Sequence, residues 1–426
     1  MSRLLGAIPT LAFAYVLIVQ PVFDRAAPGL LNKQILWPAL FALTLLFATI
    51  CRRELDLDQL KKPPFMLLIC FLCFSGASVL WAHSPPDSLK RWIGAIMIVT
   101  TIVLPMTLRK PTPDIIVGLF WLYATSIAIN AIFVLTTPPM MTDDGHVMGH
   151  TGYFYHKQYL GMCASVAILL ATHMILSGRR LVASFITICL AAWVMAEAQS
   201  RAALGFGIIA VGAAYATLLM SKITKLSVAL LVSLIPATFM SLSLVIPNIP
   251  ERLSSRIYGD PTFSGRTIIW DWVETQAALK PWLGWGFHSF WFVPNSPSFN
   301  APGFVRDMPA SHSGYLDMRL ETGYFGLLLF LAFIVATLYS LERVRQHHPD
   351  WGPPFLSLFI YVLVMNLLET IWFVQYDPLW ILFLLLAANA ARYEATHFSA
   401  VKILEPKKTR AHQFAHSTIS PLVNKR

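Results

Sequence analysis

Charged residues are scarce in this chain of 426 residues: they make up 13% of it, whereas hydrophobic residues make up 56%. A soluble globular protein carries about 25% charged residues. The shortage excludes a water-soluble body of this size, because too little polar surface is left to cover it. We therefore expect the chain to lie in a lipid bilayer. Its net charge of +10 then indicates orientation in the membrane and attraction to anionic lipid, and not nucleic-acid binding.

Cysteine is also rare, and its positions exclude a disulfide framework. The five cysteines fall within or beside apolar segments. Cys70 and Cys73 form a C-x-x-C motif, but it lies inside an apolar segment and has no second pair, so we interpret both as small packing residues. The first apolar run lacks a small-residue cleavage site and is interpreted as a retained membrane span.

Long apolar segments, in contrast, are abundant. A helix crosses the hydrocarbon core in about 20 apolar residues. Twelve segments qualify, at residues 4–20, 34–51, 65–81, 92–108, 114–136, 159–177, 181–199, 202–220, 226–247, 315–341, 354–373 and 377–393. The predicted fold is an all-α integral membrane protein with about twelve transmembrane helices. Nine of them lie in residues 1–247 and three in 315–393, with a large loop containing amphipathic helices at 248–314 and a basic, disordered tail at 394–426.

The distribution of lysine and arginine predicts the orientation of these spans, because both residues accumulate in cytoplasmic loops. When the N-terminus is placed inside, every predicted inner loop carries at least two of them, such as Arg52 with Arg53 and Arg179 with Arg180. Both termini are therefore expected in the cytoplasm. The long loop at 248–314 is expected on the outer face.

Ionisable residues close to the predicted membrane gather at its outer boundary. They are His156 and Lys157 before the sixth span, Glu197 and Arg201 between the seventh and eighth, His312, Asp317, Arg319 and Glu321 around the start of the tenth, and Glu369 near the end of the eleventh. Charge at such positions is costly and marks either a functional site or a matched pair. We expect a reaction centre here. The simpler alternatives are that Arg201 extends to the membrane surface or pairs with Glu197, and that His312 is a polar helix cap. Glu321 and Glu369 are interpreted as structural partners of the cations.

The stretch SGRTIIW at 264–270 begins a helix with one polar and one apolar face. The apolar face is expected to lie in the membrane interface; its members are Ile268, Ile269, Trp272, Val273 and Leu279. Arg266 lies at the helix N-terminus, where free N–H groups and the helix dipole favour an anion. Its guanidinium adds a permanently charged donor pair, which suits a phosphate or diphosphate. The alternative is a solvated loop charge.

Three motifs resemble the superfamily of bacterial O-antigen ligases and O-antigen or exopolysaccharide polymerases. The first is AQSRAALGFG at 198–207, similar to the family's S-R-[AGS]-A stretch. The second is SGRTIIW at 264–270, followed by PWLGWGF at 281–287. The third is SHSGYLDMRLETGYFG at 311–326, with a loop-closing histidine and a later E-x-G-x-x-G. Their order and the predicted spans together carry the resemblance over residues 1–393.

This resemblance implies a metal-independent, inverting glycosyltransferase that works without a cofactor on the periplasmic face of the bacterial inner membrane. It implies that Arg201 and Arg266 contact the donor diphosphate and that His312 activates the acceptor hydroxyl. Further substrate-binding residues are expected at Ser264, Gly265, His156, Lys157, Arg319 and Glu321. The implied partners are an undecaprenyl-diphosphate-linked glycan, an acceptor glycan, membrane lipid and, as a further candidate, a chain-length-determining copolymerase.

Two departures from the family pattern bear on the acceptor. Many members have asparagine directly after the loop histidine, where this chain has Ser313 and Gly314. Before the sixth span the chain reads GYFYHKQYLG, with Gln158 in the position of the family's amide. The HK pair is more typical of exopolysaccharide polymerases, which favours a repeat-unit polymerase. The alternative is a ligase that moves the glycan onto lipid A–core.

Two other functions are weaker. Twelve spans would suit a transporter, but transporters place their polar residues near the bilayer midplane and are built from repeats, and neither feature is seen here. A metal site could be suggested by a group of histidines and aspartates at 143–156, namely Asp143, Asp144, His146, His150 and His156. Their spacing matches no strong zinc pattern, so no metal is expected.

Overall fold

The structure is a computed structural model that describes residues 1–28, 33–109, 114–141, 147–245, 255–256, 262, 264–347 and 349–404. Most of this part of the chain is helical. The helices are α1 (Ser2–Ala14), α2 (Gln20–Ala26), α3 (Lys33–Ile50), α4 (Pro63–Ala77), α5 (Pro85–Val103), α6 (Ile115–Thr136), α7 (Lys157–Leu176), α8 (Leu181–Ala198), α9 (Arg201–Thr224), α10 (Val228–Val245), α12 (Arg266–Leu279), α13 (Gly314–His347), α14 (Gly352–Met365) and α15 (Pro378–Leu404).

Short elements join or extend these helices. A π-helical turn, η1 (Tyr15–Val19), makes α1 and α2 one continuous rod. The 3-10 turns are η2 (Arg52–Glu54), η3 (Leu57–Lys61), η4 (Ser78–Trp81), η5 (Leu104–Thr107), η6 (Pro297–Asn300), η7 (Gly303–Asp307) and η8 (Pro349–Trp351). Strands β1 (Met140–Met141) and β2 (Val147–Gly149) pair antiparallel. This small hairpin is a departure from the predicted all-α fold.

Each of the twelve predicted spans falls on a helix. Within the described residues, eight helices are long and apolar enough to cross a membrane, and three shorter apolar helices cover 34–50, 352–365 and 378–392. The number of twelve therefore stays a prediction. One boundary differs clearly, since α14 ends at Met365 whereas the predicted span reached residue 373. Residues 394–404, expected in a disordered tail, continue α15, and residues 405–426 lie outside the described part.

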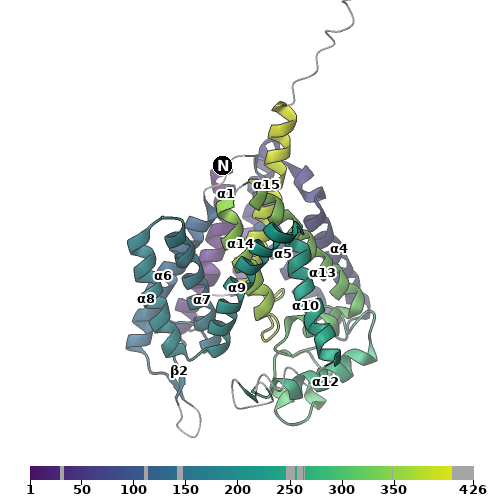
Figure 1. The fold of residues 1–426 in the computed structure, drawn as a ribbon. Coiled ribbons are helices and arrows are strands. Elements are labelled where there is room, and N and C mark those ends of the chain that lie inside the picture. Colours follow the sequence, from purple (N-terminus) through teal and green to yellow (C-terminus); the bar gives the residue numbers. More distant parts are fainter. Residues whose placement is uncertain are drawn as a thin grey trace, which may run out of the picture.

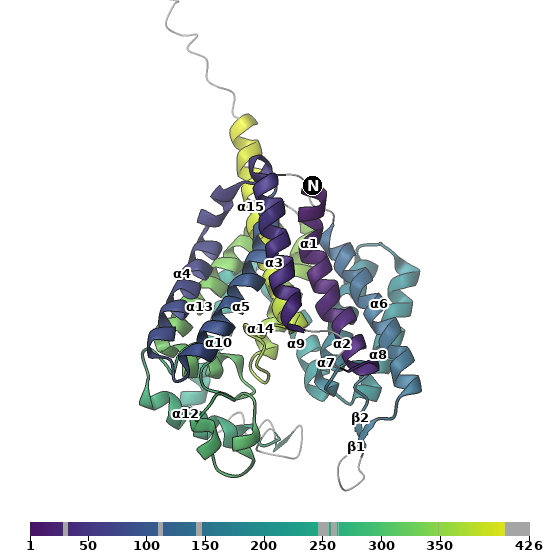
Figure 2. The same cartoon turned by 180° about the vertical axis from the view of Figure 1, so that it is seen from behind.

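The helices form one bundle whose two ends differ (Figures 1 and 2). The N-terminus and the C-terminal half of α15 lie at one end, and α12 and the β1–β2 hairpin lie at the other. Helix α7 packs against α6 and α8, α4 against α13, and α9 against α14. Small residues allow the close packing of α9, since Ala203, Ala210 and Ala214 are fully buried.

A second, smaller core holds the loop around α12. Ile269, Val273 and Ala277, spaced four apart on α12, are buried against Phe290, Val305 and other residues of the loop and of α13. Burying a side chain such as that of Val273 stabilises this unit by about 1.5–3 kcal/mol. The expected position of this face in the membrane interface therefore does not hold for Ile269 and Val273, which contact protein. The neighbouring Ile268 is 46% exposed.

Candidate active site

Two loop segments at the α12 end of the bundle are joined by backbone hydrogen bonds. The N–H of Gly314 donates to the carbonyl of Asn366 at 2.9 Å and to that of Glu369 at 3.1 Å. A Cβ on Gly314 would lie 2.3 Å from the side-chain oxygen of Asn366, so only glycine allows this approach. His312, two residues earlier, has a left-handed φ of 55°. The joined segments therefore hold the imidazole beside Glu369.

The carboxylate of Asp317 fixes the loop that carries His312. Its Oδ1 accepts hydrogen bonds from the indole of Trp291 at 2.9 Å and from the N–H of Ser311 at 3.1 Å. Its Oδ2 accepts from the hydroxyl of Thr370 at 2.5 Å. Asp317 is buried and belongs to the first turn of α13. It therefore ties the His312 loop both to the loop after α12 and to the segment of Glu369.

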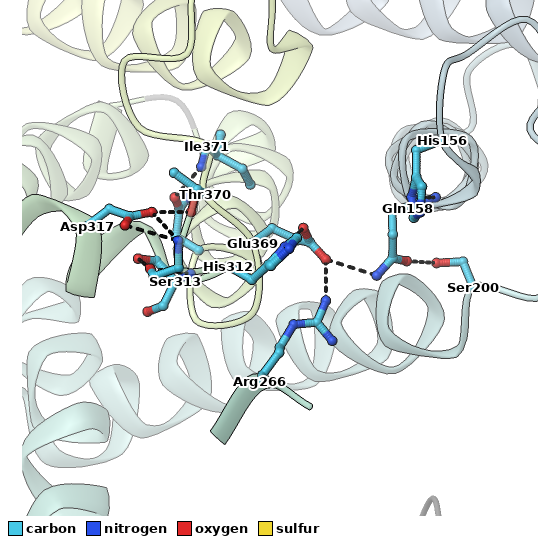
Figure 3. A network of polar contacts seen from close by, with 12 residues as sticks. His156, Gln158, Ser200, Arg266, His312, Ser313, Asp317, Glu369, Thr370 and Ile371 are labelled. Carbon is cyan, nitrogen blue, oxygen red and sulfur yellow. Dashed lines mark hydrogen bonds and ion pairs between the residues drawn. The ribbon is translucent and has the colours of Figure 1, made fainter. Parts of the chain in front are cut away.

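Glu369 lies at the centre of the polar cluster (Figure 3). Its Oε1 accepts from Nη2 of Arg266 at 2.7 Å and from the side-chain amide of Gln158 at 2.9 Å. Its Oε2 lies 3.5 Å from Nδ1 of His312. One carboxylate thus joins the arginine that begins α12, the histidine before α13 and the glutamine in the first turn of α7.

The opposite charges of Arg266 and Glu369 form an ion pair that is largely shielded from solvent. The side chains of Arg266 and Glu369 are 16% and 15% exposed. Burial alone would raise the pKa of Glu369, but the hydrogen bond from His312 and the charge of Arg266 outweigh it and hold the pKa below its ordinary value. Glu369 is therefore an anion at neutral pH. The prediction that Glu369 is a structural partner of a cation is confirmed by its ion pair with Arg266.

The cluster continues to the start of α9 through Gln158. The side-chain oxygen of Gln158 accepts from the hydroxyl of Ser200 at 2.6 Å, and Ser200 directly precedes Arg201. Arg201 is exposed and makes no ion pair with any residue that the structure describes. Glu197, its suggested partner, instead has a carboxylate oxygen 3.9 Å from Nε2 of His150. The suggested pairing of Arg201 with Glu197 is therefore wrong.

His156 and Lys157 both lie at the start of α7, next to Gln158. The ring of His156 caps the helix, with Nδ1 accepting from the N–H of Gln158 at 3.3 Å. Burial lowers the pKa of His156, although the charge of Glu369 opposes this. The ammonium of Lys157 donates to the carbonyl of Met148 on β2 at 2.6 Å. His156 therefore borders the cluster, whereas Lys157 holds the hairpin.

Ser264 and Gly265 form the turn that begins α12. Their φ angles are 61° and 85°, both left-handed, and the N–H of Gly265 donates to the hydroxyl of Thr262 at 2.9 Å. A Cβ on Gly265 would lie 3.1 Å from the ring of Phe304. The SGR motif thus places Arg266 as the first residue of the helix, as the sequence predicts.

Arg319 and Glu321 contact residues outside this cluster. The guanidinium of Arg319 donates to Glu274 of α12 at 2.7 Å and lies 4.8 Å from the centre of the Tyr324 ring. The carboxylate of Glu321 accepts from the N–H of His288 at 3.0 Å. These contacts do not pair Glu321 with a cation of the site, so they do not support its predicted role as a structural partner of one.

The glycine-rich stretches at 281–286 and 321–326 form one interface. The N–H groups of Trp285 and Gly286 donate to the carbonyls of Leu320 and Glu321 at 3.0 and 2.8 Å. Gly323 interrupts α13 with φ 64° and ψ −170°, and a Cβ there would lie 2.3 Å from the backbone of Trp282. The two motifs are therefore the two halves of a backbone contact that fixes α12 on α13.

No group of three histidine, cysteine, aspartate or glutamate side chains in the described part of the chain could hold a metal ion. Of the residues considered for such a site, Asp143, Asp144 and His146 lie outside the described residues. Gln158 is a member of the cluster that sequence reasoning did not select. Its position in the family's amide motif was the signal that could have identified it.

Comparison with known proteins supports the family resemblance that the three motifs indicate. Residues 165–331 match the family described as O-Antigen ligase. Three rickettsial proteins named as candidate polysaccharide ligases align with 36% of this chain and 40% of their own length. Those of Rickettsia felis and Rickettsia prowazekii are 27% identical, and that of Rickettsia typhi is 28% identical. The aligned region therefore spans less than half of each relative.

The apolar helices and these matches define a multi-pass membrane protein. The matches also support the predicted resemblance to the O-antigen ligase superfamily. The matched region contains Arg201, Arg266 and His312, whereas Gln158 and Glu369 lie on either side of it.

Proposed function

We propose that this chain transfers a polyprenyl-diphosphate-linked glycan to an acceptor hydroxyl at the α12 end of the bundle, on the periplasmic face of the inner membrane. The observation that supports it most is the contact of one carboxylate, Glu369, with both Arg266 and His312. A permanent cation and a titratable imidazole are thereby held together. These are the two groups that departure of a diphosphate and deprotonation of a hydroxyl require.

In the proposed step, the acceptor oxygen attacks the anomeric carbon of the donor sugar while the bond from this carbon to the diphosphate oxygen breaks. The diphosphate leaves with the bonding electron pair, and the acceptor proton passes to His312. Because Nδ1 of His312 faces Glu369, Nε2 is the nitrogen that receives the proton. Attack opposite the leaving group inverts the anomeric configuration.

Positive charge for the leaving group comes from Arg266 in this proposal, with Arg201 as a second cation. A guanidinium has five N–H donors, so Arg266 can contact a diphosphate while it keeps its bond to Glu369. Since arginines supply the charge, we expect transfer to continue in EDTA. Loss of transfer in EDTA that magnesium restores would contradict this part of the proposal.

The test uses the purified full-length protein in nanodiscs with a lipid-linked donor glycan and an acceptor. We expect Arg266→Ala and His312→Asn each to lower transfer by at least about 100-fold. Asparagine is chosen because it tolerates the left-handed φ of His312. The matched control is Arg179→Ala. Arg179 lies in the turn between α7 and α8, and its guanidinium pairs with the carboxylate of Asp114 at 2.7 Å. Transfer by Arg266→Ala at the control's rate would refute the proposal.

Two acceptors fit this step. The HK pair at 156–157 supports a repeat-unit polymerase, whereas the family description and the names of the rickettsial relatives support a ligase. A deletion strain separates them. Loss of long polymer with normal lipopolysaccharide indicates the polymerase, and intact polymer that fails to join lipid A–core indicates the ligase.

A further inference from the structure

We propose that a cavity behind the His312 loop binds the saccharide part of the acceptor; this inference rests on the proposed function. The cavity has a volume of about 630 Å³. Small-molecule sites commonly measure about 300–1,000 Å³, so the space suits a sugar residue with its neighbours. Neither Arg266 nor His312 lines it.

The cavity shares a wall with the candidate active site. Gly314, Asp317 and Thr370 line it, and they belong to the two segments that carry His312 and Glu369. Gly314 is two residues after His312 in the chain, and Thr370 directly follows Glu369. Asp317 and Thr370 lie on the side of Glu369 opposite Gln158 (Figure 3). A saccharide in this cavity would approach the imidazole from the side away from Gln158.

The chemistry of the lining suits a hydroxyl-rich ring. The lining includes the aromatic side chains of Trp291, Phe292 and Trp372, of which both tryptophans are buried, and the hydrogen-bonding groups of Gln34, Lys90 and Glu321. Aromatic faces pack against the C–H faces of a sugar, and amide, ammonium and carboxylate groups bond its hydroxyls. Phe292 is 49% exposed, so its ring is available to a ligand.

The charges of the lining do not suit a diphosphate. Asp87 and Asp317 offset two cations in the lining, Lys90 and Arg91, while burial raises the pKa of Glu321 to about 8 and keeps this carboxyl mostly neutral at pH 7. Nη1 of Arg91 already donates to the carbonyl of His288 at 2.6 Å. The balance of charge therefore favours an uncharged ligand that is recognised through hydrogen bonds to its hydroxyl groups. The diphosphate belongs with Arg266, and the acceptor saccharide with this cavity.

A second cavity extends the first. It measures about 710 Å³, and Gln34 and Tyr159 line both cavities. Three further tyrosines, Tyr153, Tyr155 and Tyr376, line it. The two spaces together could hold an acceptor longer than one sugar.

The test measures binding without chemistry. The full-length protein in nanodiscs is titrated by calorimetry with two saccharides of the source strain, the repeat-unit oligosaccharide and the deacylated lipid A–core oligosaccharide. We expect one of them to bind saturably and Phe292→Asn to weaken its binding about tenfold or more. Asparagine again suits the left-handed φ of 48° at this position. The matched control is Phe299→Asn, which alters a phenylalanine of similar exposure, 52%, outside both linings.

Arg266→Ala separates this inference from the proposed function. It should abolish transfer but leave saccharide binding within about twofold, since Arg266 does not line the cavity. Binding that is insensitive to Phe292→Asn, or absent for both saccharides, overturns the cavity assignment. Transfer that survives Arg266→Ala overturns the proposed function, and it does so in a different assay.

Discussion

Replacement of Glu369 by glutamine tests the centre of the cluster, because it changes one charge and hardly any volume. In the wild-type chain Glu369 contacts Arg266 at 2.7 Å and His312 at 3.5 Å. The amide cannot neutralise Arg266, whose side chain is only 16% exposed. Removal of one partner from a buried pair costs about 3–5 kcal/mol, and the remaining exposure puts this pair near the lower end, at about 3 kcal/mol.

The effect on transfer should be larger than this loss of stability suggests. A carboxylate behind a catalytic histidine fixes the tautomer of the imidazole, and its replacement by an amide lowers the rate by about 10⁴ in the best-studied case. We therefore expect Glu369→Gln to lower transfer by about 10²–10⁴ in protein that is verified as folded. Glu369→Asp keeps the charge on a shorter side chain, so its rate of transfer should lie between that of the wild type and that of Glu369→Gln.

The dependence of stability on pH provides a second measurement on the same variant. The pKa of Glu369 lies below 4.5 in the folded protein, so its contribution is present above that pH and is lost as the pH falls through the lower folded value. The unfolding temperature of the wild type should therefore fall more steeply below about pH 4.5 than that of Glu369→Gln. Wild-type transfer by Glu369→Gln, together with an unchanged unfolding profile, would refute the role of this carboxylate.

Three further predictions concern the surroundings of the cluster. Arg319→Ala should change transfer only a few-fold and unfolding by about 1 kcal/mol or less, because Arg319 pairs with a half-exposed Glu274; a loss comparable to that of Arg266→Ala would instead establish substrate binding. Gly314→Ala should lower stability by about 1–3 kcal/mol and lower transfer, since the new methyl group would collide with Asn366; unchanged thermal unfolding would contradict the close approach. Burial lowers the pKa of His288 from 6.5 to about 3, so its neutral form contributes stability above pH 6.5 that is lost as the pH falls towards 3. His288→Asn should flatten the fall in unfolding temperature in that range, and an equally steep fall would show that His288 does not cause it.

The sequence predicted the positions of the apolar helices well because such a helix is largely defined by its local composition. It failed at the end of α14, where residues 366–373 remain mostly apolar although the chain leaves the helix at Met365. Hydropathy cannot detect such a break. The segment leaves the helix because its backbone bonds to the His312 loop, and this contact joins residues far apart in the sequence.

The site was predicted in part for a similar reason. Arg266 and His312 stand in recognisable motifs, whereas the link through Gln158 depends on the packing of α7 beside residues 366–369. Arg319 was grouped with the site because it is near His312 in sequence. On a helix, however, residues 317 and 321 share a face and residue 319 points elsewhere, towards Glu274 of α12.

Under the proposed function, the interruption of α13 at Gly323 would set the depth of the reaction in the membrane. A helix of 34 residues would be about 51 Å long, well beyond the hydrocarbon thickness of about 30 Å. The backbone around Gly323 is bonded to the turn at 281–286, so the first segment of α13 is attached to the α12 unit. In the proposed orientation, only the second segment would then need to be immersed in lipid. Sugars and departing phosphates would then stay in the hydrated layer throughout a catalytic cycle, while the prenyl tail alone remains dissolved in the oily interior.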